Sequence, residues 1–409
     1  MPVREATGCA SSRLRGFMFH FITLPPLSLY IHVPWCVRKC LYCDFNSHAI
    51  HSTLPEKDYI AALLADLDQD LSWIESRTIG SIFIGGGTPS VLSPEAIAHL
   101  LAGVRKRLIL SDSVEVTLEA NPGTVEQLRL QEFQQAGINR LSLGIQSFNE
   151  LALASLGRIH GRQSAIAAIE ATQRAGLTNF NLDILFGLPQ QTVEMALQDL
   201  QMALSFQPPH LSWYQLTIEP HTWFYHHPPP LPDEDELWAI QTAGQNYLAE
   251  QGYIHYEISA YAQPHWQCQH NLNYWQFGDY LGIGAGAHGK ITQLTQGTIT
   301  RLLKQSHPET YLHTAHMPQV VANRTVLTAA EASLEFVMNA LRLSTGFTSR
   351  EFRLNTGLSL SYIDPAIQQA CERGWLTLSA DTDEAMRIRA TEQGWCFLND
   401  LLSLFVPES

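Results

Sequence analysis

Strand-like runs and helical segments alternate along the chain between Leu27 and Ser259. The runs are rich in β-branched or aromatic residues, and the segments between them repeat apolar residues at spacings of three and four, as amphipathic helices do. The expected strands are Leu27–Val33, Ser81–Ile84, Val114–Leu118, Leu141–Ile145, Phe180–Leu185, Leu211–Ile218 and Tyr253–Ile258. The expected helices are Tyr59–Ile74, Pro94–Leu108, Val125–Gln135, Ser164–Ala175, Val193–Phe206 and Glu234–Gln251. This alternation predicts an α/β fold with a parallel sheet curled into a full or partial TIM-type barrel.

The sequence changes character after Gly289, where polar β-formers are followed by helical patterns. The expected elements are the helices Glu331–Arg342, Pro365–Arg373 and Glu392–Phe405 and the short strands Gly374–Leu378 and Arg387–Arg389. Helices beside a small β-wing predict a separate α+β domain that is winged-helix-like. We therefore expect a loose N-terminal extension at 1–26, a barrel at 27–300 and a C-terminal domain at 301–409.

Composition excludes several classes of protein. Lys and Arg number 25 against 39 Asp and Glu, so the net charge of −14 makes the chain a poor partner for nucleic acid. The sequence has no run of about 18 apolar residues, the length that predicts a membrane-spanning helix. Seven cysteines are too few for a disulfide scaffold. Because three of them are clustered thiols, we expect a reducing, cytoplasmic location.

The clustered cysteines form the loop Cys36-Val-Arg-Lys-Cys40-Leu-Tyr-Cys43, directly after the first expected strand. Three thiolates without a fourth nearby can hold three irons of a [4Fe–4S] cluster and leave one iron open to an exchangeable ligand. The alternative is a zinc site completed by His48 or His51.

The segment from Tyr30-Ile-His-Val-Pro-Trp-Cys36 to Cys43-Asp-Phe resembles the cluster loop of the radical SAM superfamily, and specifically its HemN/HemW branch. The resemblance extends over nearly the whole chain from Tyr30 onward. It implies that the open iron binds S-adenosylmethionine (SAM) and that one electron, from a reductant such as flavodoxin or ferredoxin, cleaves SAM to a 5′-deoxyadenosyl radical. Whether this chain cleaves SAM in its working cycle is left open, and so is its standing as an enzyme.

Further motifs fall at the ends of successive expected strands, where a barrel of this kind binds its ligand. They include Gly85-Gly-Gly-Thr-Pro89, whose glycines let the backbone approach a ligand closely. Each polar residue alone could be an ordinary strand-end cap, but together they follow the family pattern. The resemblance implies that SAM is contacted by Tyr30, Tyr42, Gly86, Gly87, Thr88, Glu119, Gln146, Arg158, Asp183 and Thr217.

Two observations bear on the position within the branch. The related oxygen-independent coproporphyrinogen III oxidases carry a further cysteine two positions after the third, where this chain has Phe45. The segment His270-Asn-Leu-Asn-Tyr-Trp275 resembles an H-N-x-x-Y-W signature on the haem-chaperone side of the branch. The resemblance implies a chaperone that binds haem and passes it to an acceptor protein, with peripheral association where that acceptor is membrane-bound.

The haem ligand stays open at this point. His270 is a candidate for the haem iron, with a packed histidine in an aromatic cluster as the alternative reading. The competing ligands are His221, His226, His227, His265 and Cys268. Two rival functions are the coproporphyrinogen oxidase, which would decarboxylate propionate side chains of a porphyrin precursor, and a winged-helix regulator built on a degenerate barrel.

Overall fold

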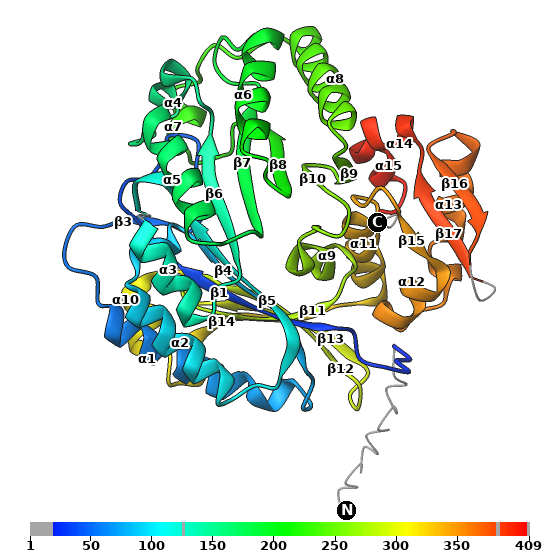
Figure 1. Ribbon diagram of the computed structural model, residues 1–409. Helices are drawn as coiled ribbons and strands as arrows, with labels where there is room; N and C mark the ends of the chain where they lie inside the picture. The colour runs from blue at the N-terminus through cyan, green and yellow to red at the C-terminus, as the bar shows by residue number, and fades with distance from the viewer. Residues whose placement is uncertain (1–18, 125–126, 382–384, 407–409) are drawn as a thin grey trace, which may run out of the picture.

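The computed structural model describes residues 19–124, 127–381 and 385–406 (Figure 1). Its main feature is one curved sheet of 12 strands in the order β14-β13-β12-β11-β1-β4-β5-β6-β7-β8-β10-β9. The strands are β1 (Leu27–Val33), β4 (Ile79–Gly86), β5 (Leu110–Ala120), β6 (Arg140–Gln146), β7 (Phe180–Phe186), β8 (His210–Gln215), β9 (Ile254–Glu257), β10 (Ala260–Ala262), β11 (Asp279–Ile283), β12 (His288–Gln293), β13 (Thr298–Lys304) and β14 (Val321–Val326). The order does not close on itself, so the barrel is partial.

The strands from β11 through β1 to β8 run parallel, which confirms the expected α/β class. One expectation is wrong: the run at Tyr253–Ile258 does not extend the parallel sheet. Its strand β9 pairs antiparallel with β10, which in turn pairs antiparallel with β8. The reason is the short connection after Glu257, because only a tight hairpin fits there and a parallel crossover needs a dozen or more residues.

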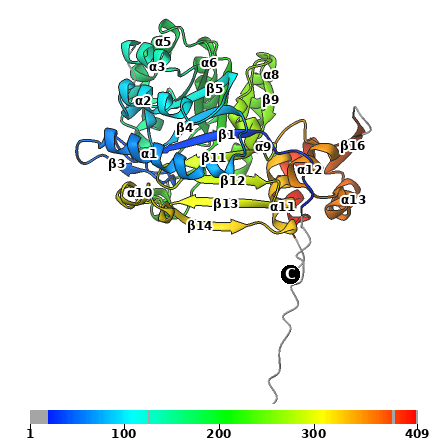
Figure 2. The ribbon, with the colours of Figure 1, turned by 90° about the horizontal axis from the view of Figure 1, so that it is seen from below.

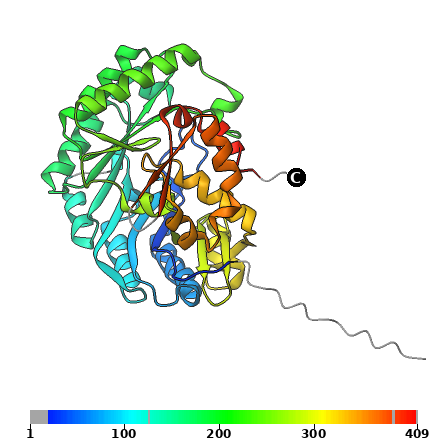
Figure 3. The same ribbon diagram turned by 90° about the vertical axis from the view of Figure 1, so that its right-hand side faces the viewer.

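Helices cover the outer face of the sheet, as Figures 1 and 3 show from two sides. They include α1 (Glu56–Asp70), α2 (Pro94–Arg105), α3 (Gln127–Ala136), α5 (Arg162–Arg174), α6 (Val193–Ser205) and α8 (Glu234–Glu250). The shorter helices α4 (Glu150–Ser155), α7 (Trp223–His226) and α10 (Pro308–Thr314) lie in connections. Helix α9 (Gln269–Trp275) packs on the inward side, where His270 contacts Ser81 and Phe83. Several begin at the caps that the sequence signals, such as Ser93, whose Oγ accepts from Ala96 N at 3.2 Å. The expected start of the third helix, Val125, lies outside the described residues.

Side chains alternate between the two faces of the sheet, as the pleat requires. In β1, Leu29, Ile31 and Val33 are fully buried in the apolar layer under the helices. Tyr30 and His32 lie on the opposite, inward face. On β1 and the strands from β4 to β8, that inward face carries mostly polar residues, namely Ser28, Ser81, Glu115, Thr117, Glu119, Arg140, Ser142, Asn181, Asp183, His210, Ser212 and Tyr214. The interior therefore differs from the packed aliphatic interior of an ordinary TIM barrel.

Three antiparallel strands, β12 to β14, continue the sheet beyond β11 (Figure 2). A buried ion network ties this extension to α1, because Lys304 Nζ lies 2.5 Å from Asp66 Oδ1 and 2.8 Å from Asp70 Oδ2. The domain boundary expected at residue 300 falls inside β13, and the sheet runs on to Val326.

The C-terminal region has its own apolar core. Its elements are α11 (Ala329–Ala340), β15 (Phe347–Thr348), α12 (Ser349–Thr356), α13 (Asp364–Glu372), β16 (Leu376–Ala380), β17 (Met386–Ala390), α14 (Glu392–Cys396) and α15 (Leu398–Ser403). The expected single terminal helix is thus two short helices, broken at Phe397 (φ −108°, ψ 42°). Part of the expected loose extension is anchored here: Phe19 packs in this core, and His20 N donates to Gly357 O at 2.8 Å.

Among the helices that the structure describes, none has the length and apolar character needed to cross a membrane.

Candidate functional site

The cysteine loop leaves the barrel at the carboxyl end of β1. A two-residue parallel ladder closes it, formed by β2 (Trp35–Cys36) and β3 (His48–Ala49). Ile50 N donates to Cys36 O at 2.9 Å, and Cys43 N donates to Cys40 O at 3.3 Å, so both ends of the loop and its inner turn are held by backbone hydrogen bonds. The three thiols are thereby presented by one small, closed loop.

All three cysteines are free thiols. Cys36 is buried and the other two are partly buried, and burial raises the pKa of the Cys36 and Cys43 thiols. Arg158 supplies a positive charge beside them, with Nη1 donating to Cys40 Sγ at 3.3 Å.

The zinc alternative requires His48 or His51 to turn toward the thiols. The ring of His48 instead lies edge-on to His307, with the ring centroids 5.6 Å apart. Among the described residues, no group of three or more His, Cys, Asp or Glu side chains is placed to hold a single metal ion. In a [4Fe–4S] cluster each thiolate binds a different iron, so the thiols do not have to converge on one point.

At the end of β4, Gly86 and Gly87 are required for a steric reason that the sequence alone does not show. A Cβ atom on Gly87 would lie 2.6 Å from Trp35 O and 3.0 Å from Cys36 Sγ. On Gly86, where φ is +120°, it would lie 2.7 Å from the ring of His32. Real Cβ atoms do not approach backbone so closely, so glycine at these positions lets the cysteine loop pack directly on β4.

Two predicted carboxylates lie deep in the barrel mouth. Glu119 Oε2 accepts from Gly86 N at 3.0 Å, and burial, with a smaller contribution from Asp183, raises the pKa of Glu119 to about 8. Asp183 accepts from Asn181 Nδ2 at 2.8 Å and Ser142 Oγ at 3.1 Å, and burial raises its pKa as well. Two carboxyls with raised pKa values on the inward face of one sheet are typical of a binding site.

A polar chain joins the motifs at three strand ends. Arg158 Nη2 donates to Asn121 Oδ1 and to Gly144 O, while Asn121 Nδ2 donates to Thr88 Oγ1 at 2.8 Å. Asn121 was not among the predicted site residues, although it follows Glu119 in the same motif. The structure therefore brings Thr88 and Arg158 together through a residue that the sequence showed but did not single out.

Two aromatic residues also reach this end of the barrel. Tyr30 Oη donates to His32 Nδ1 at 2.9 Å, and His32 Nε2 donates to Asn46 O at 2.9 Å. This assignment follows because a carbonyl only accepts, which leaves Nδ1 as the acceptor of the neutral ring. Tyr42, inside the cysteine loop, is partly buried, and burial raises its pKa.

The last two predicted residues, Gln146 and Thr217, lie in different surroundings. Tyr214 Oη, on β8, donates to Gln146 Oε1 at 3.1 Å, and Tyr214 is a second residue that the sequence reasoning missed. The strand pattern could have indicated it, because Ser212 and Tyr214 are two residues apart and so both point to the inward face. Thr217 lies on the exposed loop after β8, and no hydrogen bond joins its side chain to the others among the residues described.

His270 lies at the opposite end of the barrel, on α9. Its Nδ1 is hydrogen-bonded to Ser81 Oγ at 3.1 Å, and its ring packs against Phe83 with centroids 5.1 Å apart. The side chain is buried at 9% exposure, and burial lowers its pKa to about 3. The structure therefore places His270 in the barrel floor, where its ring centroid also lies 6.4 Å from that of Tyr30.

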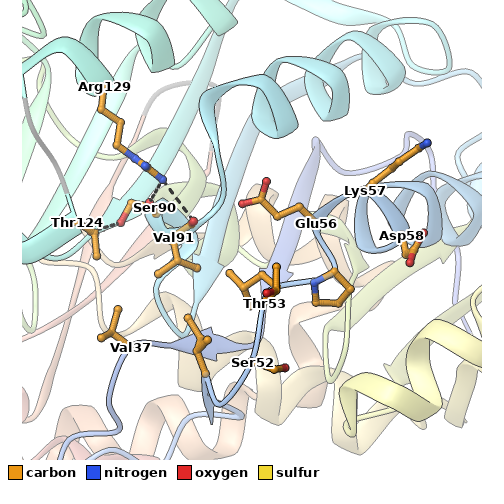
Figure 4. Close-up of a pocket in the computed structure, with 13 residues that line it drawn as sticks. Val37, Ser52, Thr53, Glu56, Lys57, Asp58, Ser90, Val91, Thr124 and Arg129 are labelled. Atoms are coloured by element: carbon orange, nitrogen blue, oxygen red, sulfur yellow. Dashed lines mark hydrogen bonds between the residues drawn. The ribbon is translucent and has the colours of Figure 1, made fainter.

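A cavity of about 700 Å³ opens beside the cysteine loop, which contributes Val37 to its wall (Figure 4). Arg129 reaches across one side and donates to Ser90 O at 2.9 Å, while Ser90 Oγ is hydrogen-bonded to Thr124 Oγ1 at 2.6 Å. None of the predicted SAM residues lines this cavity. Cys40, Thr88 and Arg158 line a neighbouring narrow space of about 20 Å³, which Arg158 crosses.

Comparison with known families matches residues 30–203 to the radical SAM superfamily and residues 327–397 to the HemN C-terminal domain. Among solved structures, the coproporphyrinogen III oxidase HemN of Escherichia coli, a radical SAM enzyme, superposes with a TM-score of 0.77. That match covers 94% of this chain and 90% of HemN at 21% identity, so it bears on the fold alone. The fold and the cysteine loop together define a radical SAM protein.

The curated relatives narrow the assignment. The heme chaperone HemW of Escherichia coli K12 is 50% identical over 387 residues, covering 95% of this chain and all of the relative. The heme chaperone HemW of Bacillus subtilis 168 is 32% identical over 391 residues, covering 93% of this chain and 99% of the relative. This chain belongs to the HemW family.

Proposed function

We propose that this protein is a haem chaperone that binds a [4Fe–4S] cluster, SAM and haem and passes the haem to an acceptor protein in the cytoplasm. The observation that carries the proposal is the 50% identity, over essentially its whole length, to a protein named as a heme chaperone. Phe45 supports it, because this side chain stands where the oxidases of the branch have their extra cysteine, and it is 60% exposed.

The residues at the barrel mouth fit the two cofactors. Cys36, Cys40 and Cys43 offer three thiols from one loop, the ligand type that iron–sulfur clusters require. SAM on the fourth iron would supply one-electron chemistry at its sulfonium group.

The chain's own residues would bind and orient that ligand. Arg158 offers a cation for a carboxylate, and Glu119 and Asp183 offer acceptors for ammonium or hydroxyl groups. Tyr30, Tyr42, Gly86, Gly87, Thr88, Gln146 and Thr217 complete the proposed SAM set.

The proposal includes partners. Haem is the cargo, a haem-binding protein is the acceptor, and a small reductant such as flavodoxin or ferredoxin would deliver the electron. Arg38 and Lys39, both exposed within the cysteine loop, support docking of an acidic reductant. Where the acceptor is membrane-bound, association would be peripheral.

The test is an anaerobic transfer assay. The protein is reconstituted with iron and sulfide, loaded with haem and mixed with an apo-haemoprotein whose absorbance changes when haem arrives. We expect haem to bind and then to move to the acceptor. A parallel reaction contains reductant, SAM and coproporphyrinogen III, and formation of decarboxylated porphyrin there would overturn the chaperone proposal in favour of the oxidase.

A further inference from the structure

His270 has little room to ligate haem iron. Its Nδ1 is engaged by Ser81, whose Oγ is also hydrogen-bonded to Ser28 Oγ at 2.8 Å. The peptide nitrogen of His270 donates to Glu115 Oε1 at 3.1 Å, which fixes the start of α9 to β5. Coordination through Nε2 would leave these hydrogen bonds in place, but it would require an opening for a porphyrin in the barrel floor, where the ring is buried and packs against Phe83 and Tyr30.

A different group of histidines lies exposed at the other end of the barrel. We define the α7 surface as the exposed residues His221, Trp223, Tyr225, His226 and His227. It belongs to the connection between β8 and α8 and so follows the carboxyl end of a barrel strand, the end at which barrels of this kind bind ligands. Trp223 is 56% exposed and Tyr225 is 54% exposed, so one short helix presents two large aromatic rings to solvent.

The base of the α7 surface is firmly held. Phe224 is 3% exposed and packs with Leu156, Leu185 and Leu216. Its peptide nitrogen donates to Leu41 O at 3.1 Å, so α7 is bonded directly to the cysteine loop. The exposed rings of α7 therefore stand on an ordered support beside the proposed cluster, rather than on a free loop.

The chemistry of this surface suits an iron porphyrin. The ring of His227 stacks on Trp223, with centroids 4.0 Å apart and an interplanar angle of 16°, and His226 packs edge-on to Tyr225 at 5.4 Å. Within the part of the chain that the structure describes, no hydrogen bond occupies the ring nitrogens of His226 or His227. Accessible imidazole nitrogens ligate haem iron, and exposed aromatic rings pack against a flat apolar macrocycle.

We infer that the α7 surface is the haem-binding site, with His226 or His227 as an axial ligand of the iron and with Trp223 and Tyr225 against the porphyrin face. The inference rests on the proposed haem-chaperone function and adds the place where the cargo binds. It assigns His270 to the barrel floor and removes it from the iron.

The test is a haem titration of the reconstituted full-length protein, followed by visible absorbance. The double variant His226→Ala/His227→Ala is compared with His313→Ala/His316→Ala, which removes two exposed histidines at α10 and just beyond it. We expect the α7 variant to bind haem at least tenfold more weakly and to lose the histidine-ligated spectrum, while the control pair binds like the unmodified protein. His270→Ala is expected to retain haem affinity. Iron and sulfide content is measured on every variant, and it should stay unchanged in both double variants.

The outcomes separate the two proposals. Failure of the unmodified protein to bind haem would overturn the proposed function itself. Binding by the unmodified protein with equal affinity in the α7 variant would overturn only the location of the site, and loss of affinity in His270→Ala alone would return the ligand to α9. Trp223→Ala tests the same surface without touching an iron ligand, and undiminished haem affinity in that variant would contradict the aromatic contact.

Discussion

The mouth and the floor of the barrel are built from the same strands but use polar side chains differently. Glu115 and Glu119 stand four residues apart on the inward face of β5. Glu115, in the floor, accepts from Cys268 Sγ and from the peptide nitrogens of Gln269 and His270, and it lies 3.9 Å from Arg140 Nε. Glu119, at the mouth, accepts from Gly86 N, and burial raises its pKa to about 8.

The number of donors around each side chain distinguishes Glu115, a structural carboxylate, from Glu119, which is available to bind a ligand. Several donors and the nearby Arg140 guanidinium satisfy the side chain of Glu115, which fixes α9 in the floor. Glu119 is partly buried and accepts from one backbone donor, Gly86 N, among the described residues, which is costly for a carboxylate unless a ligand brings further partners. Polar residues at the two ends of one strand therefore act in stability and in ligand binding respectively, as the general asymmetry of such barrels suggests.

The largest expected effect comes from adding one methyl group at the mouth. Gly87→Ala would place Cβ 2.6 Å from Trp35 O and push the cysteine loop away from β4. We expect the variant to fold but to lose most of the iron that the unmodified protein binds on reconstitution, as measured by iron and sulfide analysis. The matched control is Gly123→Ala, where an added Cβ meets nothing within 4 Å. Full iron loading of Gly87→Ala would contradict this prediction and show that the cysteine loop can move away from β4 and still bind iron.

The next effect tests the floor. Glu115→Gln leaves the shape but removes the charge that three donors share, so we expect the free energy of unfolding to fall by about 1.5–3 kcal/mol, measured by urea titration. Iron loading should stay unchanged, because the cysteine loop lies at the other end. Glu132→Gln, on the exposed side of α3, is the control and should change stability by less than about 0.5 kcal/mol. If the two substitutions changed the free energy of unfolding equally, the structural role of Glu115 would be contradicted.

Taken per pH unit, the smallest effect is a pair of opposite pH dependences. Because folding raises the pKa of Glu119 to about 8, the folded state holds the extra proton between roughly pH 4.5 and 8, and stability from this group falls as pH rises through that window. Folding lowers the pKa of His270 to about 3, so the unfolded state holds the extra proton between roughly pH 3 and 6.5, and stability falls as pH drops through that window.

Cluster-free protein shows these slopes in urea titrations at a series of pH values. Glu119→Gln should flatten the decrease in unfolding free energy between pH 4.5 and 8, and His270→Gln should flatten the decrease that occurs as pH drops from 6.5 to 3. Each slope should change by up to about 1.4 kcal/mol per pH unit. If either substitution left the pH profile of the unfolding free energy unchanged, that group would not be buried as the structure places it.

Local patterns in the sequence account for much of this protein. Strand and helix periods are properties of neighbouring residues, so the parallel strands β1 and β4 to β8 and the helices that cover them were predicted near their observed positions. The parallel strand β11 was not predicted. The loop from Cys36 to Cys43 is equally local, because its spacing alone indicates an iron–sulfur ligand set. The residues at the strand ends were predicted as a group by the resemblance to the radical SAM family, and their places at the ends of successive strands agree with it.

Contacts between distant parts of the chain were decided only by the tertiary structure. Strand β1 lies between β4 and β11, and β11 is about 250 residues away along the sequence. Sequence spacing could not show that Gly87 meets Trp35, that Glu115 fixes His270, or that Phe19 completes the C-terminal core. A side chain's type sets what it can bind, but its burial and its partners set whether that capacity is already used, and both depend on which strands the fold places side by side.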